Sequence, residues 1–158
     1  MKLRFFLCGL ILWGVELVVL PALPLVGMAV DPLFLFLIFL SFRLRSVRFL
    51  WLYGAGIGFL KDLAAAGLFG AFTLSFCGVG WVLGVSRHLL EREDPLIQGI
   101  WTGLLAGVNA AAYGVLVTAA DRSVDWNLWG WAVIPLVMAV NGGLAVWGFP
   151  RLQRIVNG

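Results

Sequence analysis

Charge is scarce in this sequence. Only 12% of the 158 residues are Asp, Glu, Lys or Arg, whereas 62% are hydrophobic, and the mean hydropathy is +1.01. Soluble globular domains are about a quarter charged and about half apolar. The few polar side chains of this chain cannot cover a soluble core. The composition therefore excludes a soluble globular domain and indicates an integral membrane protein with one transmembrane domain, residues 1–158.

Side chains that carry out chemistry are also few. The chain has one histidine, His88, and two cysteines, Cys8 and Cys77, in separate apolar stretches, which favours neither a disulfide nor a metal site. It has no glycine loop typical of phosphate binding and no nucleophile–base pair. A net charge of +3 does not favour nucleic-acid binding. We expect no enzymatic activity and therefore no catalytic residues, and we expect no metal, cofactor or nucleic-acid partner.

Six apolar stretches approach the length of about 20 residues that a transmembrane helix needs. They are residues 5–23, 25–42, 49–68, 70–86, 95–120 and 128–149. Asp31 and Pro32 interrupt the second stretch, and proline begins a helix more readily than it continues one. We expect an all-α integral membrane protein of six transmembrane helices, with the second helix short, tilted or broken at Asp31-Pro32.

The cations indicate the orientation. Six spans leave only Lys61 and Arg122 away from the side that carries the other nine Lys and Arg residues, which are Lys2, Arg4, Arg43, Arg45, Arg48, Arg87, Arg92, Arg151 and Arg154. Because cytoplasmic loops are enriched in Lys and Arg, both termini are predicted to be cytoplasmic. The basic turn of Arg43, Arg45 and Arg48 is a candidate for contact with cytoplasmic proteins or anionic lipid. Asp31 is assigned to the opposite face.

Small residues recur at every fourth position in two of the spans. They are Gly54 and Gly58 in the third span, in line with Asp62, and Gly99, Gly103, Gly107 and Ala111 in the fifth. Such stripes let helices approach closely. We expect them to pack within the helix bundle, and docking of a partner helix is the alternative. Asn109 and Asn141 are expected to form hydrogen bonds between helices.

Three charged side chains, Glu16, Lys61 and Asp62, are expected inside the membrane. The first and third spans ascend from the same side, and at about 1.5 Å per residue Glu16 and Lys61 reach the same depth. Unpaired charges at this depth are rare, so we expect Glu16 to pair with Lys61 or to share a buried polar cluster with Asp62. The alternative is that Lys61 extends outward while Asp62 caps a break in the helix.

Two stretches carry a resemblance to a known family. One is Asp31-Pro32 with the apolar run 33–40 and the basic turn after it; the other is the glycine-rich stretch 54–70 around Asp62. In these stretches, in size and in order of spans, the chain resembles the MreD family of bacterial rod shape-determining proteins, although Lys61 departs from the family's pattern. The resemblance implies a non-enzymatic scaffold of cell elongation and peptidoglycan synthesis in the bacterial cytoplasmic (inner) membrane.

The same resemblance implies the partners. They are the single-span protein MreC and, through it, the MreB cytoskeleton and the RodA glycosyltransferase with its paired transpeptidase. The alternative function is that of a substrate-binding membrane subunit of a vitamin transporter, since such subunits have a similar length and layout. That function needs a pocket, for which the sequence offers Asp31, Asp62, Trp126, Asn127 and Trp129.

Overall fold

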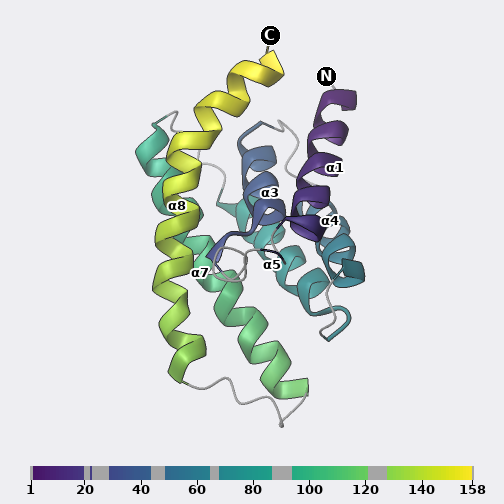
Figure 1. Ribbon diagram of the computed structural model, residues 1–158, viewed down its shortest axis with the longest axis vertical. Coiled ribbons are helices and arrows are strands. Elements are labelled where there is room, and N and C mark those ends of the chain that lie inside the picture. The colour runs from purple at the N-terminus through teal and green to yellow at the C-terminus, as the bar shows by residue number, and fades with distance from the viewer. Residues whose placement is uncertain are drawn as a thin grey trace.

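The computed structural model describes residues 2–19, 22, 29–43, 49–64, 68–86, 94–120 and 128–157. All regular secondary structure in these ranges is helical, which confirms the predicted all-α class (Figure 1). The helices are α1 (Lys2–Val18), α3 (Pro32–Arg43), α4 (Leu50–Ala64), α5 (Ala71–Val85), α7 (Pro95–Ala120) and α8 (Leu128–Asn157). Two segments, Pro95–Ala120 and Gly130–Arg154, are long and apolar enough to cross a membrane, and the other apolar helices are shorter.

Helix α3 is the short second helix that Asp31-Pro32 predicted, and it lies at the centre of the fold. It begins at Pro32 and contacts α1, α4, α5, α7 and α8. Asp31 caps it, because its Oδ1 accepts a hydrogen bond of 3.0 Å from the amide of Phe34. Its twelve residues span about 18 Å at 1.5 Å per residue. From Pro32 to Leu40 the helix is apolar on every face, and all of these residues except the half-buried Leu35 are buried.

The glycine stripes pack two helix pairs. On α4, Gly54 and Gly58 are buried against the backbone of α5, at Phe76 and Phe72 respectively. A methyl group at either glycine would lie within 3.0 Å of that backbone. The packing interpretation of this stripe is confirmed. A partner helix cannot dock on it, because α5 covers it.

The second stripe is used in the same way between α7 and α8. Gly99, Gly103 and Gly107 face α8 at Val146, Gly142 and Met138. Ala111, the fourth member of the stripe, is half-buried. Close approach of two backbones is the property that small residues give to helix pairs in membranes. Three of the four positions proposed for partner docking are therefore occupied by the chain's own last helix.

Several helices differ in length from the predicted spans. The sixth span was predicted over residues 128–149, whereas α8 continues to Asn157 with Pro135 and Pro150 inside it. A proline removes one backbone hydrogen bond and bends a helix, and here it does not end one. In the other direction, α1 ends at Val18, earlier than the span 5–23. Helix α4 is described to Ala64, and residues 65–67 of the predicted span 49–68 lie outside the described residues.

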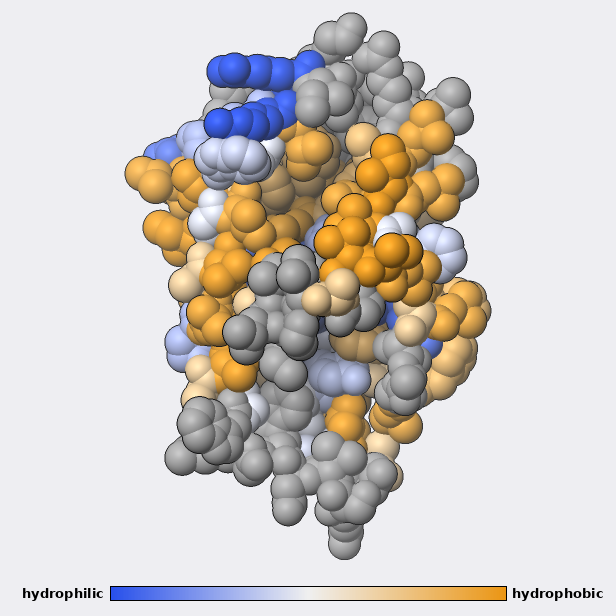
Figure 2. Space-filling view, in the orientation of Figure 1, coloured by the Kyte–Doolittle hydropathy of each residue, from blue (hydrophilic) through white to orange (hydrophobic). Residues whose placement is uncertain are grey.

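The outer surface of the described helices is largely apolar. Large hydrophobic side chains more than half exposed occur on α1, α4, α5, α7 and α8; among the most exposed are Val18, Ile11, Leu74, Trp81, Leu96, Ile100 and Trp147. Figure 2 shows such side chains over much of the visible face, with strongly hydrophilic residues gathered at the end where both termini lie in Figure 1. Of the basic turn, Arg43 is the last residue of α3, whereas Arg45 and Arg48 lie outside the described residues.

Candidate ligand cavity and its charged cluster

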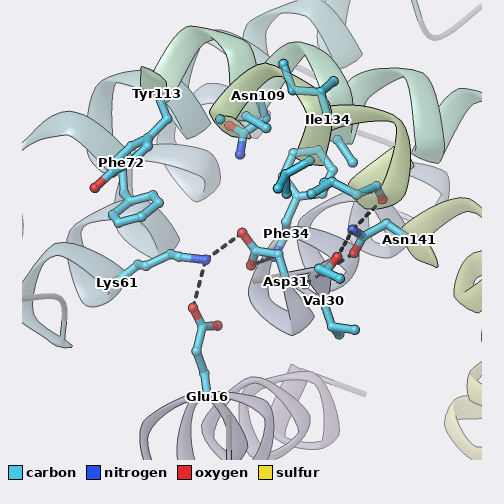
Figure 3. Close-up of a pocket in the computed structure, with 16 residues that line it drawn as sticks. Glu16, Val30, Asp31, Phe34, Lys61, Phe72, Asn109, Tyr113, Ile134 and Asn141 are labelled. Atoms are coloured by element: carbon cyan, nitrogen blue, oxygen red, sulfur yellow. Dashed lines mark hydrogen bonds and ion pairs between the residues drawn. The ribbon is translucent and has the colours of Figure 1, made fainter. Parts of the chain in front are cut away.

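Lys61 is bound by two carboxylates from different parts of the chain. Its Nζ lies 2.8 Å from Oε1 of Glu16 on α1 and donates a 2.5 Å hydrogen bond to Oδ2 of Asp31, just before α3 (Figure 3). The three side chains are 13%, 11% and 20% exposed respectively. The predicted pairing of Glu16 with Lys61 is confirmed, and extension of Lys61 toward the outer surface is wrong. We call Glu16, Asp31 and Lys61 the charged trio.

Asp31 is the member that sequence reasoning missed. The six-span topology assigned it to the outer face, although it lies within the second predicted span, 25–42. Helix α3 is short and begins in the interior, which carries its capping residue inward. The position of Pro32 in the middle of an apolar stretch was the signal that could have located it. Asp31 thus caps α3 with one carboxylate oxygen and binds Lys61 with the other.

Aromatic rings cover the other side of the Lys61 ammonium. Its Nζ lies 4.7 Å from the centroid of the Phe72 ring and 5.6 Å from that of Phe76, both on α5. Phe72 is stacked on Tyr113 of α7 with centroids 4.3 Å apart. A cation near an aromatic face gains electrostatic stabilisation, more so when water is excluded. Lys61 therefore connects α1, the start of α3, α4 and α5.

Asp62 does not belong to the charged trio. The prediction that Asp62 shares a polar cluster with Glu16 and Lys61 is therefore wrong. Its carboxylate accepts hydrogen bonds from the amides of Phe72 (3.1 Å) and Thr73 (2.9 Å) and from the Thr73 hydroxyl (2.5 Å). These groups form the first turn of α5, whose N-cap residue, Gly70, has no side-chain oxygen. Asp62 therefore caps α5, the helix that follows its own. The alternative prediction was that Asp62 caps a break within its own helix.

The two asparagines expected to join separate elements do so. Asn141 of α8 is fully buried; its Nδ2 donates to the carbonyl of Ala29 (2.7 Å), and its Oδ1 accepts from the amide of Asp31 (3.3 Å). Asn109 of α7 accepts a hydrogen bond from the Ser75 hydroxyl on α5. The segment that carries Asp31 is thereby fixed to the last helix as well as to Lys61.

A cavity of about 570 Å³ opens beside the charged trio. Its lining comes from α1, α3, α4, α5, α7 and α8 and comprises Glu16, Ala29, Val30, Asp31, Phe34, Lys61, Phe72, Ala106, Asn109, Ala110, Tyr113, Gly130, Val133, Ile134, Val137 and Asn141. Figure 3 shows the trio along one side and rings and aliphatic side chains along the others. Pockets for small molecules have about this volume, with apolar walls and a few convergent polar groups.

Of the residues that the sequence offered as a pocket lining, Asp31 lines the cavity and Asp62 does not. Trp126 and Asn127, and the side chain of Trp129, lie outside the described residues. No group of three or more His, Cys, Asp or Glu side chains in the described ranges is placed to hold a metal ion.

The chain matches no protein-family model, no curated protein and no solved structure.

Proposed function

We propose that this chain is a multi-pass protein of a bacterial cytoplasmic membrane with six spans and both termini in the cytoplasm. Three observations support the proposal: the two long apolar helices, the apolar exterior and the position of α1's start and α8's end at the same end of the fold. The excess of Lys and Arg on one predicted side supports the orientation.

The topology is tested with alkaline phosphatase and green fluorescent protein fused after each predicted loop in turn. We expect phosphatase activity after residues 24, 69 and 125, and fluorescence after residues 46, 91 and 158. Any inversion of this alternation would contradict the six-span arrangement.

Within that membrane, we propose a non-enzymatic scaffold of the cell-elongation machinery that binds a single-span partner resembling MreC. Through this partner it would connect to RodA, its transpeptidase and, indirectly, MreB. Besides the resemblance, one structural observation supports the proposal. The interior polar residues Lys61, Asp62 and Asn141 each bind one helix or segment to another. A rigid helix body with an apolar outer surface is suited to assembly with another transmembrane helix.

Co-purification tests this proposal. The full-length tagged chain, expressed at native level in its own host and extracted in mild detergent, should retain a stoichiometric single-span membrane protein, and its depletion should round the cells. Cells of unchanged shape and a chain that purifies without any single-span protein would contradict it.

The cavity favours a second candidate, the substrate-binding subunit of a vitamin transporter. Its volume and its polar side, built by Glu16, Asp31 and Lys61, are features that a ligand-binding subunit requires. This candidate predicts that the same purification yields a retained small molecule and a separate transmembrane coupling subunit. Loss of vitamin uptake without any change of cell shape would favour it over the scaffold.

A further inference from the structure

The charge beside the cavity is not balanced. Glu16 and Asp31 contribute two carboxylates, and Lys61 contributes one ammonium. Lys61 is the one cationic residue among the described residues that line the cavity. The trio therefore carries a formal charge of −1 when all three groups are ionised. A net charge away from water is unfavourable unless a further partner neutralises it.

One oxygen of the trio remains available for that partner. Oε1 of Glu16 binds Lys61. Its Oε2 is buried without a hydrogen-bond partner among the described residues. Both oxygens of Asp31 are already used, by Lys61 and by the Phe34 amide. Glu16 lines the cavity, and its buried Oε2 is thus the one carboxylate oxygen of the trio without a hydrogen-bond partner among the described residues.

We infer that the cavity binds a small organic cation, with its ammonium on Glu16 Oε2 and its apolar body among Phe34, Phe72 and Tyr113. An organic anion would add to the existing excess of negative charge. A bare divalent metal ion would need several oxygen ligands, whereas one carboxylate oxygen is free. The inference does not depend on which of the two proposed functions is correct.

The walls fit such a ligand. Phe34, Phe72 and Tyr113 are among the lining residues and give the apolar body of a ligand aromatic neighbours. Val133, Ile134 and Val137 of α8 are lining residues as well and match an aliphatic or aromatic body. At about 570 Å³ the cavity holds more than a single ion. The ammonium can come from a soluble amine or from the ethanolamine headgroup of a membrane lipid.

Calorimetric titration of the purified full-length chain tests the inference. The chain is held in dodecyl maltoside micelles without added lipid, which avoids both anionic and amine headgroups. The probes are benzylammonium, its neutral counterpart benzyl alcohol, and benzoate. We expect the dissociation constant of benzylammonium to be at least about tenfold lower than that of benzyl alcohol, which corresponds to about 1.4 kcal/mol, and we expect no binding of benzoate.

Three variants complete the test. Glu16→Gln keeps the shape of the side chain and should remove the preference for benzylammonium, whereas Asp94→Asn, at an exposed acidic residue outside the cavity, should keep it. Val133→Phe fills the cavity without changing its charge and should abolish binding of both probes. Its result decides the matter if Glu16→Gln does not fold, as judged by gel filtration.

Lipid competition identifies the source of the cation. Added phosphatidylethanolamine should displace benzylammonium if the headgroup is the ligand, and phosphatidylglycerol should not. If neither lipid displaces the probe, the ligand is a soluble amine. The inference is overturned if benzylammonium and benzyl alcohol bind equally, if neither binds, or if Glu16→Gln or Val133→Phe folds and leaves the preference intact. In that case protonation of Glu16, without a ligand, balances the charge.

Discussion

At the scale of single residues, a lysine expected to have one partner has two. The sequence predicts the contact between Lys61 and Glu16 from equal depth, and the structure adds Asp31. Because the two carboxylates come from α1 and from the start of α3, Lys61 fixes two elements to α4 at one point. Removal of one partner from a buried ion pair is more damaging than replacement of both.

This arrangement makes a charge exchange between Glu16 and Lys61 ineffective. In the double variant Glu16→Lys with Lys61→Glu, the introduced carboxylate would face Asp31, so like charges would meet where an ion pair stood. We expect each single variant to lower the free energy of unfolding by about 3–5 kcal/mol, with little recovery in the double variant. Adding Asp31→Asn to the double variant should restore stability in part. Denaturant titration in micelles measures this, and full recovery without the third change would contradict the trio.

At the scale of elements, the start of α5 depends on α4. Gly70 cannot cap α5 with a side chain, and Asp62 supplies the missing acceptors from the preceding helix. The start of α5 and the close packing of α5 on α4 thus share one polar anchor, Asp62. The close packing of α4 on α5 also requires glycine at positions 54 and 58, because any larger side chain there would meet the α5 backbone.

Loss of this cap should loosen the first turn of α5. We expect Asp62→Ala to cost about 0.5–2 kcal/mol, the range for a lost N-cap. Amide exchange at Phe72 and Thr73 should accelerate more than at residues in the middle of α5. Asp62→Asn should behave more mildly because asparagine also caps helices. Uniform acceleration along the whole helix, or none, would argue against a capping role.

The glycines of α4 offer a matched pair of variants. Gly58 faces the backbone of α5, whereas Gly56 is exposed with nothing within 4 Å of an added methyl group. We expect Gly58→Ala to destabilise by about 1–3 kcal/mol through overpacking and Gly56→Ala to be neutral or to stabilise by up to about 1 kcal/mol through helix propensity. Melting temperatures in micelles measure both effects. Equal melting temperatures would mean that α4 and α5 are not packed through the glycine stripe.

At the scale of the whole molecule, sequence patterns predict what depends on local composition. The helical class follows from the length of the apolar stretches, and the short α3 follows from the position of Pro32. The packing role of the glycine stripes follows from small residues at every fourth position. The position of Asp31, the partners of Asp62 and the cavity do not follow from local composition, because they depend on how distant segments meet. Asp31 and Lys61 are 30 residues apart, and Asn141 and Ala29 are 112 apart.

Proline shows the limit of a local rule in this chain. Pro32 begins α3 as expected, whereas Pro150 lies inside α8 and does not end it. Residue type alone therefore does not distinguish the two positions. The cavity likewise has lining residues from six helices, so no single stretch of sequence carries its pattern.

A double-mutant cycle on the charged trio tests the central claim, that Lys61 joins α1 and the start of α3 to α4. Lys61→Met is combined with Glu16→Gln and, separately, with Asp31→Asn, and the free energy of unfolding is measured in lipid bicelles. We expect a coupling energy above about 1 kcal/mol for both pairs, as contacting residues show. Additive effects for both pairs would contradict the claim.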